Sequence, residues 1–340
     1  MRSYGYDVNC NRKHTGIRQL VAWACAVTCL AVACPARARE VDQFTDRRFQ
    51  LQHLADASGV IDAEINAMLS RLVKEFNRRK PASNRDREQL IRDVFQSSRI
   101  DYIAQIVTPF ESWLRDSAPV DLYWVAERGV YGSPIDYDDM KMGWYIEPSP
   151  VIRVGSVVVG IDKIGHFLSQ GWFYYQKERE LRAALPAASD DEVDRRVRQY
   201  GHELEIGYLG LGGTGIYSYA DLAANWQGLW FYRALLSGPD PYIAIEPNGR
   251  YRLAHQFHIT DYVTDAWDEV INPSRPLTDR FFAKMVRYLR TAVCPDYRAT
   301  PTEFMNASGR TQDPRSYVWE HAPDGDFACK RRISIQDVCR

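Results

Sequence analysis

Apolar residues recur at helical spacing through much of the chain between residues 57 and 293, and this periodicity restricts the fold more than any other feature. The clearest stretch places Ile61, Ile65 and Leu69 on one helical face. The stretches that follow this pattern are residues 57–79, 86–96, 101–114, 189–205, 217–236, 260–271 and 281–293. The pattern therefore predicts a mainly α fold.

Two short segments are typical of β-hairpins instead. The sequence VIRVGSVVVG at residues 151–160 has β-branched arms on either side of Gly155-Ser156, a pair suited to a two-residue turn. A second, polar hairpin is expected around Asn248-Gly249. The chain has no internal repeat and no interdomain linker. Residues 39–293 are therefore predicted to form a single helical domain with one or two small β-hairpins.

The first 38 residues have the features of an export signal. Arg12, Lys13 and Arg18 precede an apolar stretch at residues 20–33, and Ala36-Arg37-Ala38 offers a small-x-small cleavage site. The apolar stretch is shorter than the roughly 20 residues that a membrane span needs. Two alternatives stay open, an uncleaved N-terminal anchor and a lipoprotein signal that ends at Cys34.

The rest of the chain is expected to have no transmembrane span. Its most apolar stretch, residues 226–236, is short and carries Arg233. The expected location is the periplasm or the cell envelope, with lipid anchoring through Cys34 as the alternative.

The cysteines agree with export. Three of the seven, Cys294, Cys329 and Cys339, follow residue 293, and an oxidising compartment favours pairing of two of them. A bond from Cys294 to Cys329 or to Cys339 would hold a loop-rich tail at residues 294–340. The wide spacing argues against a structural zinc site.

The charge and the glycine pattern exclude two classes of ligand. A net charge of -1 and the lack of a basic run argue against a nucleic-acid partner. The sequence GLGGTG at residues 210–215 matches a dinucleotide fingerprint but follows a predicted helix rather than a strand, so no nucleotide cofactor is expected.

The candidate site begins in GIDKIGHF at residues 160–167. Asp162 is predicted to cap a helix, and His166 projects from the same side four residues later. Asp221 and Asn225 repeat this spacing on a later helix. If the two helix starts converge, His166 is a candidate base, Lys163 an anion or oxyanion stabiliser, and Asp221 and Asn225 orienting groups.

A divalent metal is the candidate cofactor, with Glu203 or Glu205 joining His166 as ligands. A second set of residues could also bind a metal, because their spacing is helical: His255, His258, Asp261 and Asp265.

A structural interpretation competes with catalysis. Asp162 and Asp221 both stand where helix caps are favoured without any chemistry, and Lys163 could pair with Glu203 or Glu205. The residue pattern by itself favours this structural network.

The two motifs together carry a family resemblance. DKIGHF and YSYADLAANWQG resemble the motif of VanZ-like proteins and of YfiM-type envelope lipoproteins, over about residues 160–230. The chain also resembles longer exported bacterial proteins with text similar to DAWDEVINPS at residues 265–274. The resemblance implies a bacterial envelope setting and carries over six motif positions: Asp162, Lys163, His166, Asp221, Asn225 and Gly228. VanZ-like proteins span the membrane and are associated with glycopeptide resistance, whereas this chain is not expected to span it.

Two hypotheses on function follow. The chain is either a hydrolase or transferase that acts on an envelope lipid or peptidoglycan component, or a non-catalytic envelope protein whose motif joins two helix ends. An envelope lipid or glycan is the candidate partner in either case.

Overall fold

The structure is a computed structural model, and it describes residues 38–41, 53–97, 109–124, 146–207, 209–211, 215–269, 272, 274–299, 333 and 335–339. The predicted leader lies outside these residues except for Ala38, and so do Cys34 and Cys329. Within the described ranges, no helix is long and apolar enough to cross a membrane.

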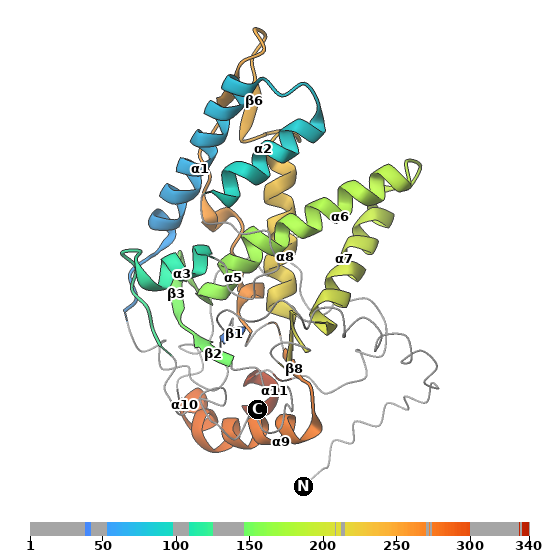
Figure 1. Ribbon diagram of the computed structural model, residues 1–340. Helices are drawn as coiled ribbons and strands as arrows, with labels where there is room; N and C mark the ends of the chain where they lie inside the picture. The colour runs from blue at the N-terminus through green and yellow to red at the C-terminus, as the bar shows by residue number, and fades with distance from the viewer. Residues whose placement is uncertain are drawn as a thin grey trace, which may run out of the picture.

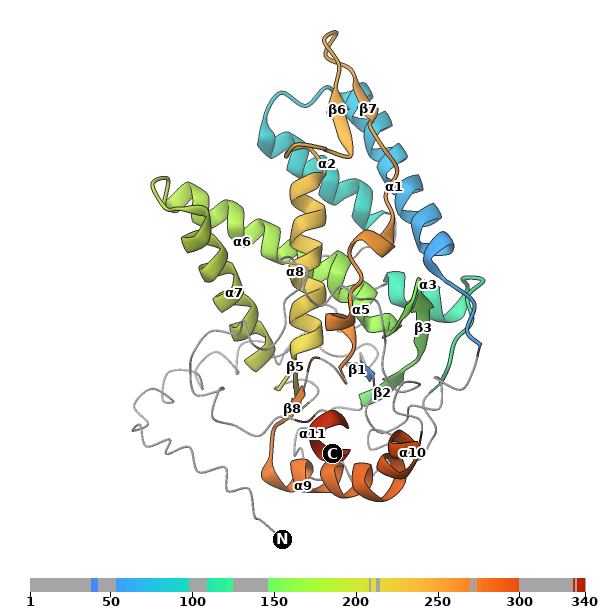
Figure 2. The same cartoon turned by 180° about the vertical axis from the view of Figure 1, so that it is seen from behind.

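Helix α8 (Tyr219–Ala234) runs through the middle of the molecule, with helices on several sides (Figures 1 and 2). Its buried residues are distributed around the whole helix rather than along one stripe, which is typical of a helix enclosed by the rest of the fold. Ser218 caps α8 by accepting a hydrogen bond from the Asp221 amide, as its spacing predicts.

A second long helical segment crosses α8. It consists of α5 (Ile161–Gly165), the π-helical turn η5 (His166–Gln170) and α6 (Gly171–Ala184). Both α6 and η5 pack against α8. A side-chain carbon added at Gly228 would lie 2.7 Å from the Gly171 Cα, so only glycine allows the two backbones to approach this closely.

Helix α7 (Asp190–Ile206) returns beside α6, and the two helices project from the body as a hairpin (Figure 1). Ser189 caps α7 by accepting a hydrogen bond from the Glu192 amide, which confirms that predicted helix start. Gly210 follows α7 directly, and a side-chain carbon there would overlap Glu205. The described glycines of GLGGTG thus belong to a turn after a helix, as predicted.

Helix α1 (Ser58–Arg79) packs against α2 (Asn84–Gln96) and holds the segment of residues 251–259 through side chains. The Asn77 amide group accepts from the Tyr251 N–H at 2.9 Å and donates to the Tyr251 carbonyl at 2.8 Å. Asn66 makes the same pair of bonds to Phe257, at 2.8 and 2.9 Å. Asp62 Oδ1 accepts from the Ile259 N–H at 2.7 Å. Side chains of α1 therefore form hydrogen bonds with backbone N–H and C=O groups of the neighbouring segment, as an adjacent β-strand would.

The strands form four two-stranded pairs within the described residues. The predicted hairpin at residues 151–160 is confirmed as β3 (Val151–Val154) and β4 (Val157–Gly160), with Gly155 at a φ of 59°. The predicted hairpin around Gly249 is confirmed as β6 (Ile243–Ile245) and β7 (Tyr251–Leu253). The remaining pairs are the parallel β1 (Ala38–Val41) with β2 (Ile146–Ser149) and the antiparallel β5 (Ile216–Ser218) with β8 (Ser274–Pro276).

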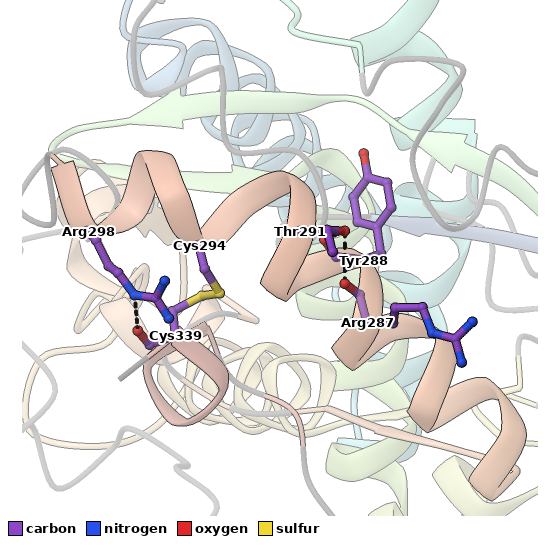
Figure 3. The surroundings of a disulfide bond; sticks show 6 residues. All are labelled: Arg287, Tyr288, Thr291, Cys294, Arg298 and Cys339. Carbon is purple, nitrogen blue, oxygen red and sulfur yellow. Dashed lines mark hydrogen bonds between the residues drawn. A yellow bond between two sulfur atoms is a disulfide. The ribbon is translucent and has the colours of Figure 1, made fainter.

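The C-terminal elements form a second apolar cluster below the main core (Figure 1). They are α9 (Asp279–Tyr288), the π-helical turn η8 (Leu289–Val293), α10 (Cys294–Ala299) and α11 (Ile335–Cys339). Because α9, η8 and α10 follow one another directly, the predicted boundary before residue 294 lies inside a helical run. Cys294 forms a disulfide with Cys339, with 5.1 Å between their Cα atoms, and Arg298 donates to the Cys339 carbonyl at 3.0 Å (Figure 3). This pairing is one of the two that the sequence left open.

The mainly α fold with small β-hairpins is therefore confirmed. One predicted helix is wrong: of residues 260–271 the structure describes 260–269, and these form two short 3-10 turns, η6 (Ile259–Asp261) and η7 (Asp265–Trp267), instead of an α-helix. Asp62 accepts the Ile259 amide and Thr264 caps the turn at Ala266, so tertiary and local side-chain bonds replace helical ones. Helix α3 (Pro109–Asp116) overlaps the end of the helix predicted at residues 101–114, of which residues 101–108 lie outside the described residues.

Candidate functional site

Lys163 lies at the centre of a buried network of charged side chains. Its ammonium is 2.6 Å from Asp162 Oδ2, 2.6 Å from Asp221 Oδ1 and 2.9 Å from Glu269 Oε1. The Lys163 side chain is 0% exposed, so no part of it reaches solvent. A buried ammonium needs this kind of compensation, because an isolated charge costs several kcal/mol to remove from water.

His166 extends the network toward the surface. Its Nε2 lies 3.2 Å from Asp221 Oδ2, and its Nδ1 lies 3.0 Å from Asn225 Oδ1. Asn225 Nδ2 in turn donates to the Tyr174 hydroxyl at 3.5 Å. The His166 side chain is 16% exposed, whereas those of Asp221 and Glu269 are 3% and 0% exposed. His166 is therefore the edge of the network that is open to solvent.

Both ring nitrogens of His166 have polar partners in the network. Nε2 faces Asp221 Oδ2 and Nδ1 faces Asn225 Oδ1, and the Asn225 amide is in turn held by the Tyr174 hydroxyl. These contacts fix the orientation of the imidazole ring.

Ser218 makes a second contact with Glu269 and joins the network to one more carboxyl group, that of Glu205. Its hydroxyl accepts from the Asp221 N–H at 3.1 Å and donates to Glu269 Oε1 at 3.1 Å. Its own N–H donates to Glu205 Oε1 at 2.8 Å. The network consequently connects α5, the start of α8, the end of α7 and the segment that follows η7.

The pKa values of three buried carboxyl groups in the network shift in different directions. Burial opposes ionisation of Asp221, but the charges of His166 and Lys163 outweigh burial and hold its pKa below the ordinary value. Burial raises the pKa of Glu269 to about 7, against the charge of Lys163. Burial also raises the pKa of Glu205 well above its ordinary range, and the charge of Asp221 adds to this. Burial thus favours the protonated form of both glutamates, whereas the neighbouring positive charges favour the ionised form of Asp221.

The helices that carry these side chains meet at closely packed glycines. The π-helical turn begins at His166, and such single turns occur frequently at functional sites. A side-chain carbon at Gly165 would overlap the carboxyl group of Glu111 on α3, and one at Gly228 would overlap the Phe167 carbonyl. The motif position Gly228 therefore permits the close crossing of the helices.

The prediction that the two helix starts converge is confirmed, because Lys163 and His166 both contact Asp221 and His166 contacts Asn225. The prediction that Asp162 caps its helix is wrong. The cap position is Gly160, which makes no side-chain capping bond, and the Asp162 carboxylate accepts from Lys163 instead.

The structure does not assemble the proposed metal ligands. Glu205 is buried and accepts the Ser218 N–H, whereas Glu203 is exposed on α7 and accepts from Gln199. Within the described part of the chain, no group of three or more His, Cys, Asp or Glu side chains could hold a metal ion. Lys163 pairs with Asp162, Asp221 and Glu269 rather than with the glutamates of α7.

The second predicted metal set does not form a metal-binding group within the described residues. His258 lies 3.1 Å from Asp62 on α1, and His255 Nε2 lies 3.6 Å from Asp240. The helical spacing that suggested a shared site is lost, because residues 260–269 form 3-10 turns rather than an α-helix.

Glu269 is the main residue of the network that the sequence analysis missed. It contacts Lys163 directly and is 0% exposed. The local signal for Glu269 is the text DAWDEVINPS at residues 265–274, whose resemblance to exported proteins implies no role for its acidic residues. Asn272 in the same segment donates to the Tyr219 carbonyl at 3.1 Å, which holds the segment against the start of α8.

Comparisons of this chain with family models, with curated proteins and with solved structures found no match.

Proposed function

We propose that this chain is an exported, non-catalytic protein of the bacterial cell envelope, with a binding or structural role, in which the His/Lys/Asp/Asn motif holds helix ends together. The leader-like residues 1–38 and the resemblance to envelope lipoproteins support the location. An envelope lipid or glycan is the proposed partner.

The observation that carries the structural role of the motif is the enclosure of Lys163 by three carboxyl groups. Its ammonium has oxygen partners within 2.9 Å and no exposed surface, so it offers nothing to a substrate. Asp221 is similarly engaged, with one oxygen toward Lys163 and the other toward His166.

Thermal melting of His166→Ala separates this proposal from catalysis. If the motif is structural, loss of the contacts with Asp221 and Asn225 lowers stability by about 1–3 kcal/mol and the melting temperature by roughly 3–8 °C. The matched control is His53→Ala, because His53 is exposed. A melting temperature equal to that of the unmodified chain would contradict the structural role.

The proposed location has its own test. Fractionation of cells that express the full-length chain, followed by mass analysis of its N-terminus, is expected to place it in the envelope with cleavage after Ala38. A lipid on Cys34 would support the lipoprotein alternative. A chain that keeps its N-terminus and stays in the cytoplasm would refute export.

One observation favours a second candidate function, a hydrolase or transferase acting on an envelope lipid or peptidoglycan component. His166 is paired with a carboxylate and is partly exposed, as a general base would be, and it starts a π-helical turn. Release of phosphate from a polyprenyl diphosphate, or cleavage of purified peptidoglycan, would support this candidate if His166→Ala abolished it without a change in melting temperature.

A further inference from the structure

The helical run from α9 through η8 to α10 has an apolar face and a basic face. Its buried side chains recur every four residues: Phe281, Met285, Leu289 and Val293. Arg280 and Arg287 lie seven positions apart, close to two helical turns, and Arg290 follows three positions later. All three arginines are exposed. The run therefore turns its apolar side chains toward the C-terminal cluster and its arginines outward.

This outward face is more basic than the chain as a whole. Residues 279–299 contain five basic and two acidic side chains, a surplus of three positive charges, whereas the full chain has a net charge of -1. The Lys284 ammonium is buried and Arg298 donates to the Cys339 carbonyl, so the arginines at 280, 287 and 290 define the basic face. Within the described residues, Arg287 and Arg290 form no ion pair. Figure 3 shows the Arg287 guanidinium directed away from the disulfide.

The basic face lies at one end of the molecule. Among the labelled elements, α9 and α10 form the end opposite the β6–β7 hairpin (Figures 1 and 2). Strand β1, which begins at Ala38, lies in the same half of the molecule as α9. Four residues join Cys34 to Ala38, and they span at most about 14 Å. A membrane anchor at Cys34 would therefore attach to the half of the molecule that carries the basic face.

The composition of the basic face suits a layer of anionic head groups better than a protein partner. Protein interfaces depend on large apolar or aromatic anchors at their centre, and residues 279–299 expose no large hydrophobic side chain. Guanidinium groups bind phosphate oxygens through paired hydrogen bonds. Leu277, two residues before α9, is 41% exposed, and a bilayer surface accommodates an apolar side chain beside basic ones.

We propose that Arg280, Arg287 and Arg290 form a docking face for the phosphate-bearing, anionic head groups of a lipid bilayer. This inference rests on the envelope location proposed above and names the lipid surface as the partner. The contact is electrostatic, so salt weakens it. Each basic residue near an anionic membrane surface strengthens binding about fivefold.

The test measures the affinity of the full-length chain for vesicles of phosphatidylglycerol and phosphatidylcholine in about 0.1 M salt. The variant with all three substitutions, Arg280→Gln, Arg287→Gln and Arg290→Gln, is expected to bind about 100-fold more weakly than the unmodified chain. On vesicles of phosphatidylcholine alone, the two chains are expected to bind equally. The leader is identical in both chains, so the difference between them reports the basic face.

The matched control has the same net charge as this variant. It replaces three arginines that are 47%, 64% and 69% exposed elsewhere on the surface: Arg71→Gln, Arg78→Gln and Arg195→Gln. The control is expected to bind within about threefold of the unmodified chain, because charges more than about 10 Å from the membrane are screened. Equal weakening by the control and by the variant would overturn the proposal, as would equal loss on both kinds of vesicle.

A second measurement needs no variant, in case the triple substitution does not fold. Phenylglyoxal modifies exposed arginines, and mass analysis of peptides locates the modified residues. Vesicles of phosphatidylglycerol are expected to slow the modification of Arg287 and Arg290 but not of Arg195. Unchanged rates at Arg287 and Arg290 would show that the basic face does not contact the bilayer. Both measurements use the purified chain, so a failure here is distinct from a failure of export in cells.

Discussion

Replacement of Lys163 by methionine would remove the ammonium from the centre of the network and keep most of its volume. Asp162, Asp221 and Glu269 would then face one another without the charge that lies 2.6–2.9 Å from each. Removal of one member of a buried ion pair costs about 3–5 kcal/mol, because the partner charge stays buried. Proton uptake limits this loss, since an aspartate with an ordinary pKa binds a proton at pH 7 at a cost of about 4 kcal/mol. Lys163→Met is therefore expected to lose about 3–5 kcal/mol of stability.

Urea denaturation at pH 7 measures this loss as a lower midpoint with little change in slope. Lys177→Met is the matched control, because Lys177 is 34% exposed and pairs with an exposed glutamate, so a change of less than about 1 kcal/mol is expected. The deficit of Lys163→Met is also expected to shrink at about pH 5, where carboxylates bind protons at lower cost. A loss below about 1 kcal/mol, or a deficit that does not shrink in acid, would refute the charge argument.

Two further substitutions test the packing and the side-chain bonds of the fold. Gly228→Ala is expected to lower stability by about 3 kcal/mol or more, because the added carbon meets backbone atoms of the crossing helix. The control is Gly59→Ala, where no atom lies within 4 Å of the added carbon. Equal melting temperatures for the two variants would contradict the close crossing. Asn66→Ala is expected to lower stability by about 2–4 kcal/mol, measured by urea denaturation, because it removes two hydrogen bonds to the buried backbone of Phe257. The control Gln199→Ala changes an exposed side chain and is expected to lower stability by under about 0.5 kcal/mol.

The fold was predictable where the signal is local. The caps at Ser189 and Ser218 depend on residues three positions apart, and the turn at Gly155 depends on the conformational freedom of one glycine. The spacing of acid with imidazole or amide also identified the motif residues at the two helix starts, whereas their convergence around Lys163 entered only as a condition.

The failures of prediction arise where contacts of the folded chain replace the expected local bonds. Asp162 lies where a cap is favoured, but the cap position is Gly160 and the Asp162 carboxylate accepts from the buried ammonium of Lys163. Residues 260–271 have helical spacing, yet Asp62 on α1 accepts the Ile259 amide, and only a short 3-10 turn forms at Ile259–Asp261. In both cases a contact made only in the folded chain outweighs a local preference of about 1 kcal/mol or less.

The sequence by itself thus determined most of the helices, the two predicted hairpins and the identity of the motif residues on α5 and α8, because periodicity and capping act within a few positions of the chain. Only the tertiary structure decided how the charges of these residues are compensated. Glu269 lies 106 positions from Lys163, and no local pattern relates them. Their contact arises because a buried ammonium must find its carboxylates wherever the fold brings them.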